Sequence, residues 1–224
     1  MKTISQAAAW LVTLLVPVIL VLGTVRLLLT PLFIQIEYRL PNFPPDTYGF
    51  TQAERLKWAD VARRYLLNDA GIDFLGDLQF EDGTPLYNER ELRHMLDVKI
   101  VVRRAMAVLY FALLLCASIG FWFSRSGRWW DFRIALARGG WLTVGLLAAL
   151  LLGIALSFNV LFVAFHRIFF EGDTWIFRYS DTLIRLFPVR FWQDAFLTTA
   201  GIPLLAGWLL ARQAGWKNRS SVSA

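Results

Sequence analysis

Long apolar segments dominate the pattern of hydrophobic and polar positions along the chain. Four of them run at about 7–29, 100–123, 141–165 and 191–211. A helix rises about 1.5 Å per residue and needs roughly 20 residues to cross the hydrocarbon core of a bilayer. The pattern therefore predicts four transmembrane helices, the last of which is the least regular because Asp194 and Pro203 interrupt it.

The first apolar segment carries no charge from Ala7 to Leu22. This run is too long for the apolar region of a secretory signal peptide, so we predict a retained signal anchor. The composition agrees with a membrane protein, because 57% of the 224 residues are hydrophobic. Soluble domains are usually nearer half apolar.

Charge predicts the orientation of the four segments. Lysine and arginine follow the second segment and the fourth: Arg125, Arg128, Arg133, Arg138, Arg212, Lys217 and Arg219. The loop at 31–99 is acidic instead, with twelve Asp and Glu against eight Lys and Arg. Because basic residues stay in the cytoplasm, we expect both termini inside a bacterial plasma membrane and loops 31–99 and 166–190 outside. The formal charge of +6 then reflects topology and contact with anionic lipid, not nucleic-acid binding.

The first outer loop contains signals for local structure. Thr51 with Glu54, and Asn88 with Glu91, are two capping boxes that open helices. We expect the first helix to stop before Gly71 and the second to run directly into the second membrane segment. Residues 77–87 alternate polar and apolar around an Asp-Gly pair, which indicates a short hairpin or paired strand.

These patterns together predict an all-α integral membrane protein with a single domain over residues 1–224. Its core is a bundle of four transmembrane helices, and a small mixed extracytoplasmic subdomain occupies the first outer loop. The one cysteine, Cys116, lies in the middle of the second membrane segment. A single thiol forms neither an internal disulfide nor a cysteine-type zinc site, so we interpret it as a packing residue.

The chain contains two histidines, and the predicted topology brings them to one place. His94 precedes the second membrane segment and His166 ends the third, so both lie at the outer interface of adjacent antiparallel helices. Glu91, His94 and Asp97 are spaced i, i+3, i+6 and share one helix face. A carboxylate beside an imidazole raises its basicity and fixes its tautomer, as a general base requires.

Simpler structural roles compete with catalysis at each of these positions. Glu91 also fits a helix cap, and Asp97 fits an ion pair with a neighbouring basic side chain. The two histidines fit interfacial polar residues without a chemical role. Arg103 and Arg104 are expected to reach lipid phosphate headgroups.

The chain contains no glycine-rich phosphate loop, HExxH or GxSxG motif. We therefore predict chemistry without ATP, a nicotinamide or a helix-borne zinc pair, and assign no cofactor and no metal. One alternative stays open: the two histidines with Asp97 or Asp173 have the residue types of a metal site.

Several stretches resemble the family of bacterial membrane proteins that contains the lipoprotein intramolecular transacylase Lit. They are PPDTYG at 44–49, LYNERELRHMLDVK at 86–99, FHRIFFEGDTWIF at 165–177 and DTLIRLFP at 181–188. The likeness spans nearly the whole chain. It implies a reaction on diacylated lipoproteins in which the sn-2 acyl chain of the diacylglyceryl-cysteine moves to the cysteine's own α-amine. The product is a lyso-form lipoprotein.

An ester that becomes an amide runs downhill, and both reacting groups belong to one substrate. The protein therefore need supply only positioning, a base and oxyanion stabilisation, which agrees with the absence of nucleotide motifs. Two other functions remain as alternatives: a metal-dependent intramembrane hydrolase and a non-enzymatic membrane scaffold.

The resemblance places the family's two functional histidines at His94 and His166. We interpret His166 as the base, and His94 as the group that polarises the ester or shuttles the proton. We predict supporting roles for five further side chains: Glu91, Asp97, Asp173, Trp175 and Asp181. Contacts with acyl chains or headgroups are predicted for Phe169, Phe170, Arg103 and Arg104, with Trp175 also shaping the acyl pocket.

Overall fold

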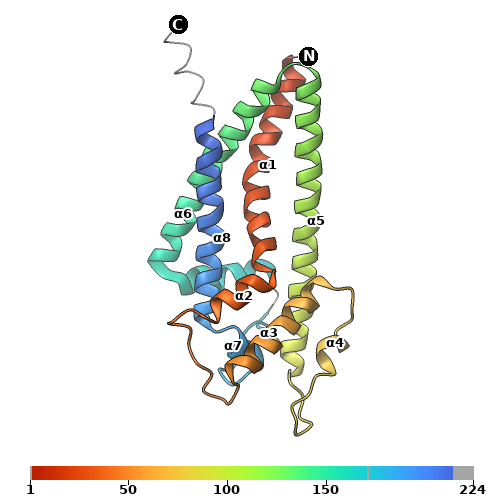
Figure 1. Cartoon of the computed structure of the whole chain (residues 1–224), viewed down its shortest axis with the longest axis vertical. Helices are drawn as coiled ribbons and strands as arrows, with labels where there is room; N and C mark the ends of the chain where they lie inside the picture. Colours follow the sequence, from red (N-terminus) through yellow and green to blue (C-terminus); the bar gives the residue numbers. More distant parts are fainter. Residues whose placement is uncertain (1, 171, 214–224) are drawn as a thin grey trace. The chain divides into compact units, whose positions relative to one another are not determined.

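The computed structural model describes residues 2–170 and 172–213, so the basic tail residues Lys217 and Arg219 lie outside the described part (Figure 1). Over this part the fold is helical. The helices are α1 (Lys2–Leu28), α2 (Pro31–Glu37), α3 (Gln52–Leu67), α4 (Asp73–Gly76), α5 (Glu89–Arg125), α6 (Trp129–Phe169), α7 (Thr182–Leu186) and α8 (Val189–Gln213). Helices α1, α5, α6 and α8 are long and apolar enough to cross a membrane, and each corresponds to one predicted segment.

The chain divides into two compact units. Unit 1 comprises the described residues within 1–25, 106–156 and 197–224, and unit 2 comprises those within 26–105 and 157–196. Both histidines belong to unit 2, so the candidate site lies within a single unit.

Unit 1 is held together by close approach of helix backbones at glycines. A Cβ atom at Gly139 of α6 would lie 2.5 Å from the Cβ of Val16 in α1. A Cβ at Gly140 would collide with the carbonyl oxygen of Gly207 in α8. Small residues allow such contacts between apolar helices in a membrane, where packing replaces the hydrophobic effect as the driving force. The hydroxyl of Thr13 adds an interhelical hydrogen bond to the carbonyl of Ala135, at 3.2 Å.

Unit 2 folds around an apolar core that joins the loop at 31–99 to residues after α6. Its buried members include Phe50, Tyr65, Leu75, Leu86, Met95, Leu183 and Leu186. Phe50 and Leu86 lie in the loops before α3 and α5, and the others come from α3, α4, the first turns of α5 and α7. The helix starts follow the two predicted capping boxes, since Thr51 and Glu54 bond reciprocally at the start of α3. Asn88 and Glu91 do the same at the start of α5, at 2.8 and 3.1 Å.

The prediction of a mixed subdomain in the first outer loop is wrong, because residues 2–170 and 172–213 contain no strand. Residues 77–87 form a turn closed by one antiparallel bridge between Gln79 and Pro85. Gly83 supplies the positive φ of 81° that the turn requires. The N–H of Phe80 donates to the carbonyl of Thr84 and the N–H of Leu86 to the carbonyl of Leu78, both at 2.8 Å, and these two bonds flank the bridge.

Helix α6 is interrupted at Ser157, whose φ of −164° and ψ of 102° are not helical. Residues 158–169 therefore form a separate helical segment, which carries His166. The predicted membrane segment at 141–165 crosses this break, and the boundary between the two units falls at the same position. His166 is thus positioned by the second segment and by its packing in unit 2.

A buried ion pair ties the PPDTYG stretch to α7. The carboxylate of Asp46 accepts hydrogen bonds from Nε and Nη2 of Arg185 at 3.2 and 3.1 Å, with 2% and 10% of the two side chains exposed. Arg55 bonds the carbonyls of Arg185 and Pro44 at 2.9 and 2.7 Å. These contacts fix the loop before α3 against the helix that follows the second outer loop.

A buried carboxyl group lies between α2 and α8. Glu37 is 2% exposed, and one of its oxygens has no hydrogen-bond partner among the described residues. Burial raises the pKa of Glu37 to about 8, with further contributions from a hydrogen bond and repulsion by Asp194, while Arg190 opposes the shift. The folded protein therefore holds a proton here that the unfolded chain releases near the ordinary value of 4.5.

We expect Glu37→Gln to remove part of the pH dependence of stability. A folded-state pKa above the unfolded value gives stability that is complete below the unfolded pKa and is lost as pH rises toward the folded one. The wild type should therefore lose on the order of 2–4 kcal/mol relative to the variant between pH 5 and 8. Thermal unfolding followed by tryptophan fluorescence in detergent measures this, and parallel pH profiles for the two proteins would contradict it.

Candidate active site

The two histidines lie together in unit 2. His94 projects from the second turn of α5 and His166 from the helical segment after Ser157. Their ring centroids are 6.3 Å apart, their planes are inclined by 19°, and each residue is 8% exposed. The prediction that the two side chains meet is therefore matched by the geometry, at a site largely removed from water.

Aromatic rings surround the pair. Phe170 contacts both histidines, with centroids 4.9 Å from His94 and 5.5 Å from His166. Phe177 meets the ring of His94 edge-on at 5.2 Å, and Trp175 lies 4.8 Å from His166. Phe170 directly follows α6, and Trp175 and Phe177 reach the pair from the loop beyond it.

The enclosing loop is fixed by local hydrogen bonds. The indole N–H of Trp175 donates to the carbonyl of Gly172 at 3.1 Å, and Gly172 adopts a positive φ of 64°. The guanidinium of Arg90, in the first turn of α5, donates to the carbonyl of Ile176 at 3.1 Å. These bonds hold the loop that carries Trp175 and Phe177 against the helix that carries His94.

One hydrogen bond fixes the tautomer of His166. Its Nδ1 lies 2.8 Å from the carbonyl oxygen of Phe162, one turn earlier in the same helical segment. A carbonyl oxygen can only accept, so Nδ1 carries the proton in the neutral ring and Nε2 presents its lone pair. The Nδ1 of His94 is buried and has no hydrogen-bond partner among residues 2–170 and 172–213. The pair thus offers one oriented base and one buried ring nitrogen without a protein partner.

Glu91 bonds backbone groups. Its carboxylate accepts from the N–H of Asn88 at 2.8 Å and from the N–H of Leu183 at 2.7 Å. The residue is 1% exposed and joins the start of α5 to α7. Within the described chain no hydrogen bond links Glu91 or Asp97 to His94. Asp97 is half-buried on the same helix face.

Two further carboxylates were predicted to support the histidines, Asp173 and Asp181. Asp173 is exposed. Asp181 caps its own turn by accepting from the N–H of Arg178 at 2.8 Å, and it accepts from the side-chain amide of Asn88 at 3.2 Å. Asp181 therefore positions the loop between α6 and α7 and makes no hydrogen bond to either imidazole.

The four residues predicted to contact lipid differ in their exposure and in their protein partners. Phe170 is 9% exposed and packs on both histidines, whereas Phe169 is 47% exposed and packs on Phe165. Arg103 pairs with Asp69 at 2.7 Å, and its neighbour Arg104 is exposed.

The arrangement does not assemble the ligands that the metal-dependent alternative requires. Among the described residues, no three His, Cys, Asp or Glu side chains lie close enough together to hold a metal ion.

Sequence reasoning missed two members of the site. The carbonyl of Phe162 fixes His166 from position i−4, a relation that any helical histidine satisfies when its ring turns back along the helix. Phe177 follows Trp175 at i+2 on an irregular loop, where spacing indicates no common face. The many aromatic residues within 165–177 indicated that rings surround the histidines, but they did not identify Phe177 in particular.

Known proteins resemble this chain over most of its length. A family model described as lipoprotein intramolecular transacylase Lit matches residues 9–192. An uncharacterized protein of Aquifex aeolicus (strain VF5) is 32% identical over 187 residues, which are 83% of this chain and 82% of that protein.

Solved structures of one bacterial protein share the fold. The membrane integral lipoprotein intramolecular transacylase Lit from Bacillus cereus matches with a TM-score of 0.70 and 18% identity, covering 100% of both chains. A variant of it with one histidine changed to alanine matches with a TM-score of 0.74 and 20% identity, covering 100% of this chain and 97% of that one. Together with the four long apolar helices, the matches identify an integral membrane protein, and the chain belongs to the family of the lipoprotein intramolecular transacylase Lit.

Proposed function

We propose that this protein moves the sn-2 acyl chain of a diacylglyceryl-cysteine to the α-amine of the same cysteine, without a metal or cofactor. The proposal places the reaction at the outer leaflet of a bacterial plasma membrane, with both protein termini in the cytoplasm. The observation that carries it is the buried pair of histidines, one of which has a fixed tautomer. Family membership supports the same substrate class, diacylated lipoproteins.

In this proposal His166 is the general base. Its Nδ1–H is occupied by the carbonyl of Phe162, so Nε2 is left to accept a proton. The free amine attacks the ester carbonyl carbon and a new C–N bond forms. The proton leaves the nitrogen for His166. The bond between the acyl carbonyl carbon and the ester oxygen then breaks, and that oxygen, which stays on the sn-2 carbon, takes up a proton. The products are an amide and a free sn-2 hydroxyl group.

His94 is proposed to hydrogen-bond the ester or to return the proton to the leaving oxygen. Both roles need a ring nitrogen free of protein partners, which its Nδ1 is. The aromatic rings around both histidines favour acyl chains over water. Exclusion of water matters because hydrolysis of the ester competes with attack by the amine.

The other predicted residues are proposed to take no part in the proton transfers. Glu91 and Asp181 bond the backbone of α7 and of the loop before it, and so act as positioning residues. Phe169 and Phe170 would contact acyl chains, and Arg104 a headgroup. Arg103 reaches a headgroup only if it leaves Asp69. No contact of Asp97 or Asp173 supports a specific role for either.

The test is fragmentation mass spectrometry of a lipoprotein N-terminal peptide from cells with and without this chain. Because the transfer is intramolecular, we expect the peptide mass to stay the same. The fragments should instead show one acyl chain on the cysteine amine and only one on the glyceryl group. Cells that carry His166→Ala at equal expression are the control. Loss of one acyl chain from the mass would identify a hydrolase and contradict the proposal.

A further inference from the structure

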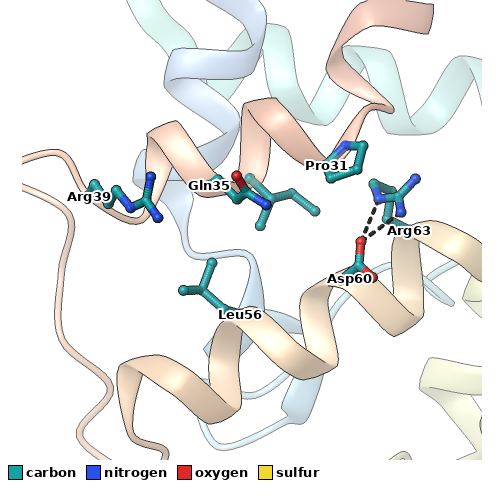
Figure 2. Close-up of a pocket in the computed structure, with 7 residues that line it drawn as sticks. Pro31, Gln35, Arg39, Leu56, Asp60 and Arg63 are labelled. Atoms are coloured by element: carbon teal, nitrogen blue, oxygen red, sulfur yellow. Dashed lines mark hydrogen bonds and ion pairs between the residues drawn. The ribbon is translucent and has the colours of Figure 1, made fainter.

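A cavity of about 320 Å³ lies between α2 and α3, apart from the histidine pair (Figure 2). One wall is formed by Pro31 and Gln35 of α2 and by Arg39 just after it. The other wall is formed by α3, with Leu56, Asp60 and Arg63. Charged groups therefore line the cavity on both sides, together with the amide of Gln35 and several apolar side chains, and the cavity belongs entirely to unit 2.

Two polar side chains on the α2 wall have no protein partner. Gln35 lies in α2, and Arg39 follows two residues after that helix ends; both line the cavity (Figure 2). Both are exposed, and within the described chain neither side chain makes a hydrogen bond or an ion pair. An arginine fork and an amide at this spacing match the oxygens of a phosphate group, which accept several hydrogen bonds at once.

The charged side chains of the α3 wall are held by ion pairs and hydrogen bonds. Asp60 accepts from Nε and Nη2 of Arg63 at 2.9 and 2.6 Å, and Nη1 of Arg63 donates to the carbonyl of Leu29 at 3.1 Å. Arg64 shares the same carboxylate at 3.1 Å. A guanidinium has five N–H donors, so Arg63 retains two after these bonds. Asp60 is thus neutralised by arginines of its own helix, and the unpaired Arg39 on the opposite wall leaves the charged lining with a net positive charge, which favours an anion over an ammonium group.

The face of α2 beside the cavity is apolar and exposed. Leu32, Ile36 and Leu40 are spaced by four residues, and their exposed fractions are 62%, 50% and 38%. Helix α2 starts three residues after α1 ends, so it begins where a membrane-spanning helix leaves the hydrocarbon. A helix with such a stripe at that depth lies along the headgroup layer with its apolar side toward the acyl chains. The cavity therefore opens at the level of lipid phosphates.

We propose that this cavity binds the headgroup of an anionic phospholipid. The phosphate contacts Arg39 and Gln35, the spare donors of Arg63 face the same cavity, and the acyl chains lie along the stripe of Leu32, Ile36 and Leu40. A volume of about 320 Å³ accommodates a phosphoglycerol headgroup and excludes the chains. The site is distinct from the histidine pair, so it stands independently of the transacylase proposal.

The test is native mass spectrometry of the full chain released from nanodiscs that contain equal amounts of phosphatidylglycerol and phosphatidylcholine. We expect the wild type to retain phosphatidylglycerol preferentially. Arg39→Glu should reduce that retention by roughly tenfold or more, because charge-assisted hydrogen bonds to phosphate are lost. The reversal is made at an exposed side chain without protein partners, so folding should be preserved and is checked by thermal unfolding.

Lys57→Glu is the matched control, since Lys57 is an exposed cation of α3 that does not line the cavity. It should change retention by less than about twofold. Equal losses in the two variants would reduce the effect to general surface charge and overturn the proposal. A third arm adds inorganic phosphate to the detergent-solubilised protein. Binding of phosphate that depends on Arg39, without any retained phospholipid, would assign the cavity to free phosphate instead.

Discussion

Replacing either His94 or His166 by alanine is expected to reduce the rate of acyl transfer by 10²–10⁴-fold, the usual contribution of a positioned acid or base. His166→Ala removes the nitrogen that accepts the proton of the attacking amine. His94→Ala removes the ring nitrogen that the proposal assigns to the ester or the leaving oxygen. The measurement is the initial rate with a purified diacylated lipopeptide, using fragmentation to count the N-acyl product.

Matched controls separate chemistry from folding. Arg93→Ala and Arg167→Ala change exposed neighbours of the two histidines and should leave the rate within a few-fold of the wild type. All four variants should unfold at similar temperatures. If either histidine variant kept more than about a tenth of the wild-type rate, that residue would be a structural member of the aromatic cluster and the assigned role would be withdrawn.

The meeting of the histidines was predictable because it depends on topology. Two antiparallel membrane helices that end on one side bring their terminal residues to one interface, and apolar length identifies such helices. The helix starts were predictable for a similar reason, since each capping box is a local pattern of four residues. Long apolar runs and capping boxes can be identified from the sequence because each depends only on residues that are neighbours along the chain.

The break at Ser157 could not be predicted in this way. The surrounding residues, from Leu151 to Phe162, read as one continuous apolar helix with no proline to interrupt it. The non-helical conformation of one residue reflects packing in unit 2, where Phe162 and Phe165 meet His166 and Phe196. Ser157 also accepts a hydrogen bond from the N–H of Val160 at 3.4 Å, as an N-cap does, so the local signal is a single serine within a long apolar run.

The role of Glu91 was ambiguous in the sequence for a different reason. Glu91 lies one turn from His94, and it is also the last residue, at position N3, of the capping box that begins at Asn88. The backbone N–H of Leu183, far away in sequence, donates a hydrogen bond to the Glu91 carboxylate at 2.7 Å. This bond favours the structural role of Glu91 over a role beside His94. Because the Glu91 carboxylate already accepts from two backbone N–H groups, another group must fix the tautomer of a histidine at this site. For His166 the carbonyl of Phe162 does so.

A lipopeptide whose cysteine amine is already acylated should not react at all, even though it carries the same ester. Attack requires a nitrogen lone pair, and an amide nitrogen has none available. The experiment mixes the blocked peptide with an equal amount of the free-amine peptide in one reaction, so that the second serves as an internal standard. We expect complete conversion of the free-amine peptide while the blocked peptide retains both ester-linked chains.

The same requirement sets the pH dependence. An α-amine has an ordinary pKa near 7.7–8.0 and is a nucleophile only when deprotonated. Between pH 6 and 8 the deprotonated fraction rises roughly 40-fold, so the rate should rise by about that factor and then level off.

A chelator should leave this profile unchanged. Loss of the sn-2 chain from the blocked peptide would show that water is the nucleophile, since water needs no free amine. Loss of activity with the chelator and recovery with zinc would make His94 and His166 metal ligands, with Asp97 or Asp173 as the side chain that must move to join them.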